Sequence, residues 1–275
     1  MSETGTILSG SAALKIAVPG SCNPTDLNMY CPKGTAKTVA QYFLENPDIR
    51  RVPLPVKKVG AERTPFSKFD VNRGVRKIYL FHHTITGKVI TLCESIAESP
   101  LVPLLFFHAS FVMNYVSGHD VVCLYSALTE NYSGLSNLHP EFTLIHKPGQ
   151  NRKWISRGFD VHADCSYLHS IHATVLSGVE KGACQWASRR SDDRWIARVS
   201  FQVCPVGSPV SPIISWQLGR RVTEKNGIMP GVVQVAGDKW YMNTFRPGGV
   251  WVEYYAPVDR RSGKVVSAWW KRSFP

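Results

Sequence analysis

Basic side chains lie beside tryptophans at several positions in the second half of the chain. Arginine and lysine neutralise phosphates without reading bases, and an aromatic ring stacks on an unpaired base for roughly 1–3 kcal/mol. Together they would hold single-stranded nucleic acid of any sequence. The residues of this pattern that we predict to contact nucleic acid are Arg152, Lys153, Trp154, Arg189, Arg190, Arg220, Arg221, Lys271 and Arg272.

Tryptophan can serve the core as well as the surface, and all eight tryptophans lie between residues 154 and 270. Segments with the alternating pattern of strands contain Trp195, Trp216 and Trp251, and we favour core positions for these three. Charged residues surround Trp154 and follow Trp269-Trp270, which favours surface positions for these three tryptophans.

The formal net charge is +12, and its distribution is uneven. Residues 147–275 contain 19 Lys and Arg against 9 Asp and Glu, or +10, whereas residues 1–146 contain 13 against 11, or +2. Such an excess predicts an anionic partner, either nucleic acid or an anionic membrane surface. A protein that is basic without such a partner is the alternative.

Nine histidines and seven cysteines raise the question of a metal site. Structural zinc ligands come as closely spaced pairs, often CxxC. No CxxC occurs here, and the spacing is irregular within the densest group, which is His162, Asp164, Cys165, His169 and His172. We therefore predict no metal. We also predict no nucleotide cofactor, because neither GxGxxG nor GxxxxGK[ST] is present.

A catalytic cysteine is a further alternative, since Cys184 ends a Gly-Ala-Cys turn similar to that of chymotrypsin-like viral proteases. The order of His82 or His83, an acid and then Cys184 fits a triad. However, Gln185 follows the cysteine where those enzymes have glycine, and no histidine follows His172. We expect a protein without enzymatic activity, with a cysteine protease as the second alternative.

The elements that position these residues must be arranged around residues 101–128, an apolar stretch within a span that lacks Lys and Arg from residue 89 to 146. Its Val, Phe and Tyr content and a turn at residues 117–120 predict two buried strands at the centre of the core. A membrane span is not expected, because residues 101–116 fall short of the roughly 20 apolar residues required.

Seven prolines between residues 19 and 65 predict a loop-like N-terminal region. One short helix is expected at residues 35–46, with Val39, Tyr42 and Phe43 on one face. We predict an N-terminal arm at residues 1–75 and a β-sandwich domain at residues 76–275, with a bend at residues 205–212. No secretory signal is recognisable, and the odd number of scattered cysteines predicts a reducing compartment.

Short strands are expected throughout the second domain. The segment at residues 194–203 alternates most regularly, which predicts a half-buried strand with Trp195, Ala197, Val199, Phe201 and Val203 on one face. Such a series predicts an all-β fold, an antiparallel jelly-roll-like sandwich with one or two short helices. The expected strands cover residues 76–81, 88–93, 141–146, 158–162, 169–176, 194–203, 213–218, 232–236, 239–245, 250–255 and 265–270.

The central stretch resembles that of plant-virus movement proteins of the 30K superfamily, over roughly residues 76–204. The matching positions are Gly118, Val121 or Val122, Leu124, and Asp160 or Asp164. The resemblance implies a jelly-roll protein that binds single-stranded nucleic acid and carries it between cells through plasmodesmata, in the host cytoplasm and at cell junctions. Viral capsid proteins are thought to share that fold, so a capsid or matrix protein in the virion is the first alternative. In either role the chain could form a homo-oligomer.

Overall fold

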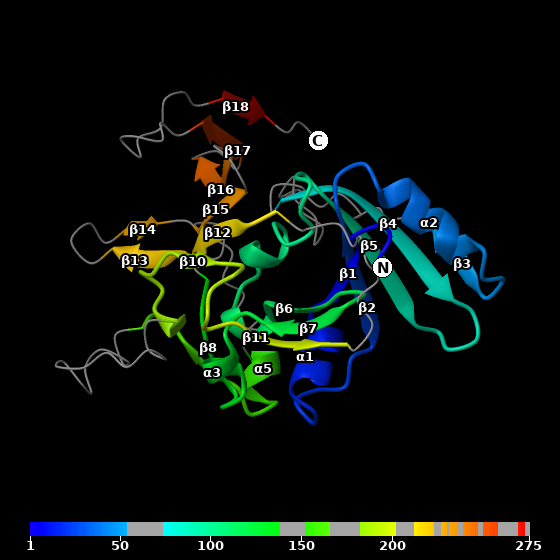
Figure 1. Ribbon diagram of the computed structural model, residues 1–275, viewed down its shortest axis with the longest axis horizontal. Helices are drawn as coiled ribbons and strands as arrows, with labels where there is room; N and C mark the ends of the chain where they lie inside the picture. The colour runs from blue at the N-terminus through cyan, green and yellow to red at the C-terminus, as the bar shows by residue number, and fades with distance from the viewer. Residues whose placement is uncertain are drawn as a thin grey trace, which may run out of the picture.

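The computed structural model describes residues 1–53, 74–137, 152–165, 182–201, 212–222, 227–229, 231–235, 239–246, 250–257 and 269–272. The chain is mostly β, as predicted, and two sheets enclose a common core (Figure 1). Two expectations need correction. The larger sheet is mixed rather than antiparallel, and the described residues contain four short α-helices instead of one or two. The jelly-roll strand order stays a prediction.

The larger sheet has eight strands in the order β11-β7-β6-β1-β2-β5-β4-β3, with one parallel pair, β2 and β5. Three of these strands come from the region before residue 65, so the expectation of a loop-like N-terminal region is wrong there. The prolines left room for strands of three to six residues. The bounds are β1 (Ile7–Ser9), β2 (Asp26–Cys31), β3 (Ile49–Val52), β4 (Val75–His83), β5 (Val89–Ser95), β6 (Asn114–Val116), β7 (Asp120–Cys123) and β11 (Ala197–Ser200).

Two helices belong to the N-terminal region, α1 (Ser11–Ala17) and α2 (Ala36–Leu44). The second confirms the expected helix at residues 35–46. Its Val39 packs into a cluster with Phe81 and Leu92 of the larger sheet, and Phe43 packs partly against that cluster. Tyr42, expected on the same face, is 71% exposed, so that part of the prediction is wrong.

The stretch at residues 101–128 is the centre of the core, as predicted. β6 and β7 are its two strands, and the Ser117 hydroxyl caps their turn by accepting hydrogen bonds from the backbone N–H groups of His119 and Asp120. The remainder forms the 3-10 helices η1 (Leu104–Phe106) and η2 (Ser110–Val112) and the helix α3 (Ser126–Thr129), not longer strands. No helix in the described part of the chain has the length and apolar character needed to span a membrane.

Close packing explains why position 118 in the β6–β7 turn is a glycine. A Cβ atom there would lie 2.7 Å from the backbone nitrogen of Ser2, a separation that side chains do not adopt. The N-terminal segment therefore packs directly over the turn, and glycine is the residue that permits this approach.

The smaller sheet has six antiparallel strands, β10 (Arg189–Arg190), β12 (Ile214–Gln217), β15 (Val232–Val235), β16 (Lys239–Arg246), β17 (Val250–Pro257) and β18 (Trp269–Arg272). β12, β15, β16 and β17 confirm the strands expected at residues 213–218, 232–236, 239–245 and 250–255. β18 shares only residues 269–270 with the strand expected at 265–270, and residues 265–268 lie outside the described residues. Trp216 and Val233 of this sheet share one buried cluster with Tyr115 and Val122 of the larger sheet. The strands β12 and β15 of the smaller sheet therefore pack against the larger sheet in the main buried cluster.

Smaller elements complete the described fold. β13 (Arg220–Val222) pairs with β14 (Gly227–Met229), and β8 (Ser133–Leu135) pairs in parallel with β9 (Asp160–His162), which follows the helix α5 (Arg152–Ile155). The expected strands at residues 141–146 and 169–176, and all but the last residue of the expected bend at 205–212, lie outside the described residues.

The strand expected at residues 194–203 exists as β11, but its burial was predicted incorrectly. Val199 in β11 is 67% exposed, and Phe201, directly after this edge strand of the larger sheet, is 46% exposed. Alternation identified a strand but could not show whether another layer covers its apolar face.

Candidate nucleic-acid interface

The helix α5 contains the first predicted cluster. Arg152 and Lys153 are exposed, as a contact with nucleic acid requires. Trp154 is 5% exposed and packs edge-on against Phe111 and Phe159, at centroid distances of 5.0 Å and 5.6 Å. The prediction of a surface role for Trp154 is therefore wrong, because this indole completes a secondary core under α5.

Among the described tryptophans, Trp186 is exposed and lies beside a basic group. Its side chain is 65% exposed, and the guanidinium of Arg220 lies 5.6 Å from its ring centroid. The Trp186 carbonyl accepts a hydrogen bond from Gln217 Nε2 at 2.9 Å. The preceding Gln185 is buried and donates to the backbone carbonyl of Ser136 at 2.7 Å. The backbone under the indole is thus held in place while its ring faces solvent.

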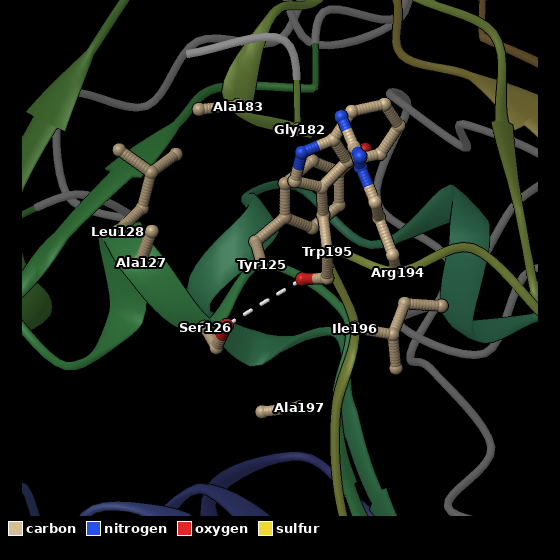
Figure 2. A pocket seen from close by; sticks show the side chains of 10 residues that line it. All are labelled: Tyr125, Ser126, Ala127, Leu128, Gly182, Ala183, Arg194, Trp195, Ile196 and Ala197. Carbon is tan, nitrogen blue, oxygen red and sulfur yellow. Dashed lines mark hydrogen bonds between the residues drawn. The ribbon is translucent and has the colours of Figure 1, made fainter. Parts of the chain in front are cut away.

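Arg194 and Trp195 form a second contact between a guanidinium and an indole, at 5.0 Å (Figure 2). Arg194 is exposed and Trp195 is half-buried, so the prediction of a core position holds only in part for Trp195. The pair follows the same signal, a basic residue next to tryptophan, that selected the predicted contacts. Arg194 is not among the predicted contacts, because Trp195 was predicted to be a core residue.

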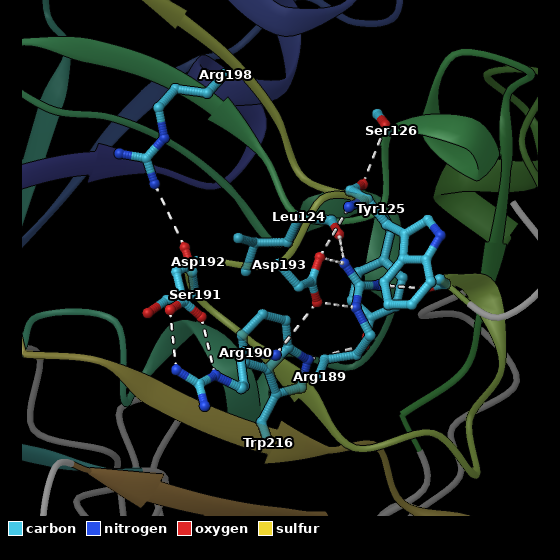
Figure 3. A network of polar contacts seen from close by, with 12 residues as sticks. Leu124, Tyr125, Ser126, Arg189, Arg190, Ser191, Asp192, Asp193, Arg198 and Trp216 are labelled. Carbon is cyan, nitrogen blue, oxygen red and sulfur yellow. Dashed lines mark hydrogen bonds and ion pairs between the residues drawn. The ribbon is translucent and has the colours of Figure 1, made fainter. Parts of the chain in front are cut away.

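Arg189 is buried, with 1% of its surface exposed, so its prediction as a nucleic-acid contact is wrong. Its guanidinium donates to both carboxylate oxygens of Asp193, to the Leu124 carbonyl at 2.9 Å and to the Gly182 carbonyl (Figure 3). A buried guanidinium needs such compensation, since an unpaired charge in the interior is costly. Arg189 thus has a structural role, because its hydrogen bonds join Asp193, Leu124 and Gly182.

Aromatic rings surround the buried Arg189 guanidinium. The Arg189 guanidinium lies 4.8 Å from the Tyr125 ring centroid and 5.6 Å from that of Trp216. Trp216 is 2% exposed, which confirms its predicted core position, and its Nε1 donates to the Tyr125 hydroxyl at 2.8 Å. Burial raises the pKa of Tyr125 to about 12, although the nearby Arg189 charge opposes the shift. The tyrosine therefore stays protonated and polar at neutral pH.

Arg190 is exposed, but its charge is compensated by Asp192 at 2.9 Å. This hydrogen-bonded pair raises the pKa of Arg190 and lowers the pKa of Asp192. Arg198, on β11, is likewise paired with Asp120 at 3.0 Å. Basic residues that have nearby carboxylates contribute less to phosphate binding than the sequence count suggests.

The predicted contacts do not form one surface. α5 lies at the bottom of the view in Figure 1, whereas β13 lies at the left edge of the ribbon. β10 and β18 are the two edges of the six-stranded sheet, five strand spacings apart, which is about 24 Å at ~4.8 Å per strand. Lys271 and Arg272 are in β18 and Arg221 is in β13, and their side chains lie outside what the structure describes.

Cys184 lies beside a second thiol. Its Sγ is 3.8 Å from the Sγ of Cys165, and it accepts a hydrogen bond from the Trp186 backbone nitrogen at 3.3 Å. His82 and His83, the predicted triad histidines, end β4 and pair with β3, as expected for a strand terminus. Among the described residues, no group of three or more His, Cys, Asp and Glu side chains could hold a metal ion.

Comparison with known proteins leaves the family open. No protein-family model, curated protein or solved structure matches the chain. The resemblance to movement proteins therefore stays a prediction.

Proposed function

We propose that the protein binds single-stranded nucleic acid without base preference. The observation that carries this proposal is the exposed indole of Trp186 with the Arg220 guanidinium 5.6 Å from its ring. An exposed ring offers a stacking face to any base, and an adjacent cation offers a partner to the phosphate. The excess of basic residues after residue 146 supplies the long-range attraction for a polyanion.

The biological role that we propose is that of a viral movement protein. It would escort single-stranded nucleic acid from cell to cell through plasmodesmata and would not act as an enzyme. The support is the sequence pattern around Gly118 and Leu124, together with a β-rich fold and a basic second half. Binding without base preference suits this role, because a transported genome must be held along its whole length.

A capsid or matrix protein is the second candidate, and one observation favours it. Val199 and Phe201 expose apolar surface at β11, the edge of the larger sheet. Exposed apolar side chains on an edge strand suit a contact between subunits. Regular particles or a large uniform oligomer in light scattering would favour the shell protein, whereas a monomer or small oligomer that co-purifies with nucleic acid would favour the transport protein.

The test is the salt dependence of binding to an unstructured single-stranded RNA. We expect affinity to fall steeply with salt, because phosphate contacts release counterions. Trp186→Ala should weaken binding by roughly 5-fold or more at every salt concentration. Arg220→Gln should reduce the slope of log affinity against log salt by about one.

Matched controls come from the other end of the molecule. Tyr42→Ala removes an exposed aromatic ring from α2, and Arg51→Gln removes a guanidinium that lies 4.8 Å from the Tyr79 ring centroid. Both controls should bind RNA as the unaltered protein does. RNA binding that is absent, or that is equally insensitive to the variants and to the controls, would refute the proposal.

A further inference from the structure

A pocket of about 290 Å³ opens beside Trp195. One wall comes from α3 with Ala127 and Leu128, and the other from Trp195, which precedes β11, and from Ala197, the first residue of β11 (Figure 2). Ala183 closes one side, and the remaining lining includes Arg194. The pocket is thus mainly apolar, with an indole in its wall and a guanidinium in its lining.

The main chain fixes the position of this indole. A Cβ atom on Gly182 would lie 2.6 Å from both Cβ and Cγ of Trp195, so glycine permits the close contact. The Trp195 backbone nitrogen donates to Asp193 Oδ1 at 3.0 Å, and the Trp195 carbonyl accepts from the Ser126 hydroxyl at 3.5 Å. The ring therefore forms a preorganised wall.

Arg194 differs from the other arginines of residues 189–198. Arg189, Arg190 and Arg198 each have an aspartate partner. Arg194 is exposed and, within the part of the chain that the structure describes, makes no ion pair. Its guanidinium lies over the Trp195 ring instead. The cation beside the pocket is therefore available to an anionic ligand.

We propose that this pocket accepts one unpaired base of a single-stranded nucleic acid, with the base stacked on Trp195 and an adjacent phosphate bound by Arg194. This inference rests on the proposed function and adds a second base contact to that of Trp186. The ligand must combine a flat apolar face with a negative charge, and a nucleotide does. On binding, the base takes the position over the indole that the guanidinium now holds, and the guanidinium turns to the phosphate.

The same geometry predicts little discrimination among bases. The Ser126 hydroxyl hydrogen is directed to the Trp195 carbonyl, and the neighbouring side chains Ala127, Leu128 and Ala183 have no hydrogen-bonding groups. Base-edge readout needs polar groups in fixed positions, whereas stacking uses the π-face that every base has. The pocket therefore fits a protein that holds any sequence.

The experiment compares an oligouridylate with an abasic oligonucleotide of equal length and charge. Both are titrated against the intact chain and against Trp186→Ala, so that base dependence remaining in the variant comes from outside the Trp186 surface. We expect Trp186→Ala still to bind the base-containing strand at least about 5-fold more tightly than the abasic strand. Adding Ala127→Phe, which fills the pocket with a ring, should abolish that remaining ratio and leave abasic binding unchanged.

A second substitution keeps the test valid if Ala127→Phe is unstable. Arg194→Gln changes an exposed side chain and should weaken both strands, reducing the salt slope by about one. Thr38→Phe, which adds the same ring to an exposed position of α2, is the control and should change neither strand.

The outcomes separate the two proposals. Equal binding of both strands to Trp186→Ala, or a base dependence that survives Ala127→Phe, would overturn the pocket while leaving single-strand binding intact. Failure of the intact chain to bind either strand would overturn both proposals.

Discussion

Two tryptophans have a basic group beside the indole, and the fold uses them in opposite ways. Trp154 follows Arg152-Lys153 in the sequence, whereas the fold brings Arg220 to Trp186. In α5, Trp154 is 5% exposed and packs on Phe111, whereas Trp186 near β13 is 65% exposed and stacks with Arg220. Both indoles have a cation within 6 Å of the ring centroid. The cation alone therefore does not mark a binding surface, and the exposed ring face is what distinguishes a candidate contact from a core residue.

The difference between the buried and the exposed indole is tested most strongly by replacing each tryptophan with alanine. Trp154→Ala should lower the free energy of unfolding by about 3–5 kcal/mol, because it leaves a cavity beside Phe111 and Phe159. Trp186→Ala should change it by less than about 0.5 kcal/mol, as is usual for surface substitutions. Urea unfolding followed by circular dichroism measures both, and similar losses for the two variants would contradict the comparison.

The next largest effect concerns the two neighbouring arginines of β10. Arg189→Ala should lower the free energy of unfolding by about 3 kcal/mol, since it leaves the mostly buried Asp193 without its partner. Arg190→Ala should leave the unfolding midpoint unchanged, because its pair with Asp192 is exposed. The same urea titration decides this, and equal midpoints for the two variants would refute the structural role of Arg189.

The sequence predicted the elements of the core better than the exposure of single side chains. Residues 101–128 were identified as the core because their apolar content and the turn at Ser117 are local properties. Short strands such as β1 were missed, because a three-residue strand is defined by its partners β2 and β6 rather than by its own pattern. The parallel pairing of β2 with β5 is likewise non-local.

The candidate site was predicted only in part, for a related reason. Arg189 and Arg190 are adjacent and equally basic, yet one is buried and the other exposed, because consecutive residues of a strand face opposite sides. The aspartates at positions 192 and 193 were a usable signal of charge compensation. The alternation in β11 could not show that Val199 lies at a sheet edge, since edge position depends on the whole strand order.

The stability of the protein at alkaline pH reports on two buried thiols of the larger sheet. Burial raises the pKa of Cys31 to about 11 and that of Cys93 to about 12, above the ordinary value of 9.0. The folded protein keeps protons that the unfolded chain releases, so stability is full below pH 9 and falls between about pH 9 and 11. The expected loss is on the order of 1 kcal/mol per pH unit and thiol.

The control for this pH dependence is the double variant Cys31→Ala and Cys93→Ala. It lowers stability at every pH but should flatten the decline between pH 9 and 11, relative to the unaltered protein. Urea unfolding at half-unit pH intervals gives the two slopes. Parallel slopes would show that these thiols do not set the alkaline limit.

The smallest expected effect belongs to the exposed basic residues of α5. Arg152→Gln combined with Lys153→Gln should change RNA affinity by less than about 2-fold and leave the salt slope as it is, because these charges lie outside the two proposed contacts at Trp186 and Trp195. A filter-binding titration at three salt concentrations measures this. A loss comparable to that of Arg220→Gln would extend the interface to α5.

The most direct test of the central claim is photo-crosslinking of the intact chain to a single-stranded RNA that contains 4-thiouridine, followed by mass spectrometry of the peptides. We expect adducts on the peptides that contain Trp186 and Trp195, and none on the peptide that contains Trp154. Adducts confined to residues 152–158, with Trp186 unmodified, would contradict it.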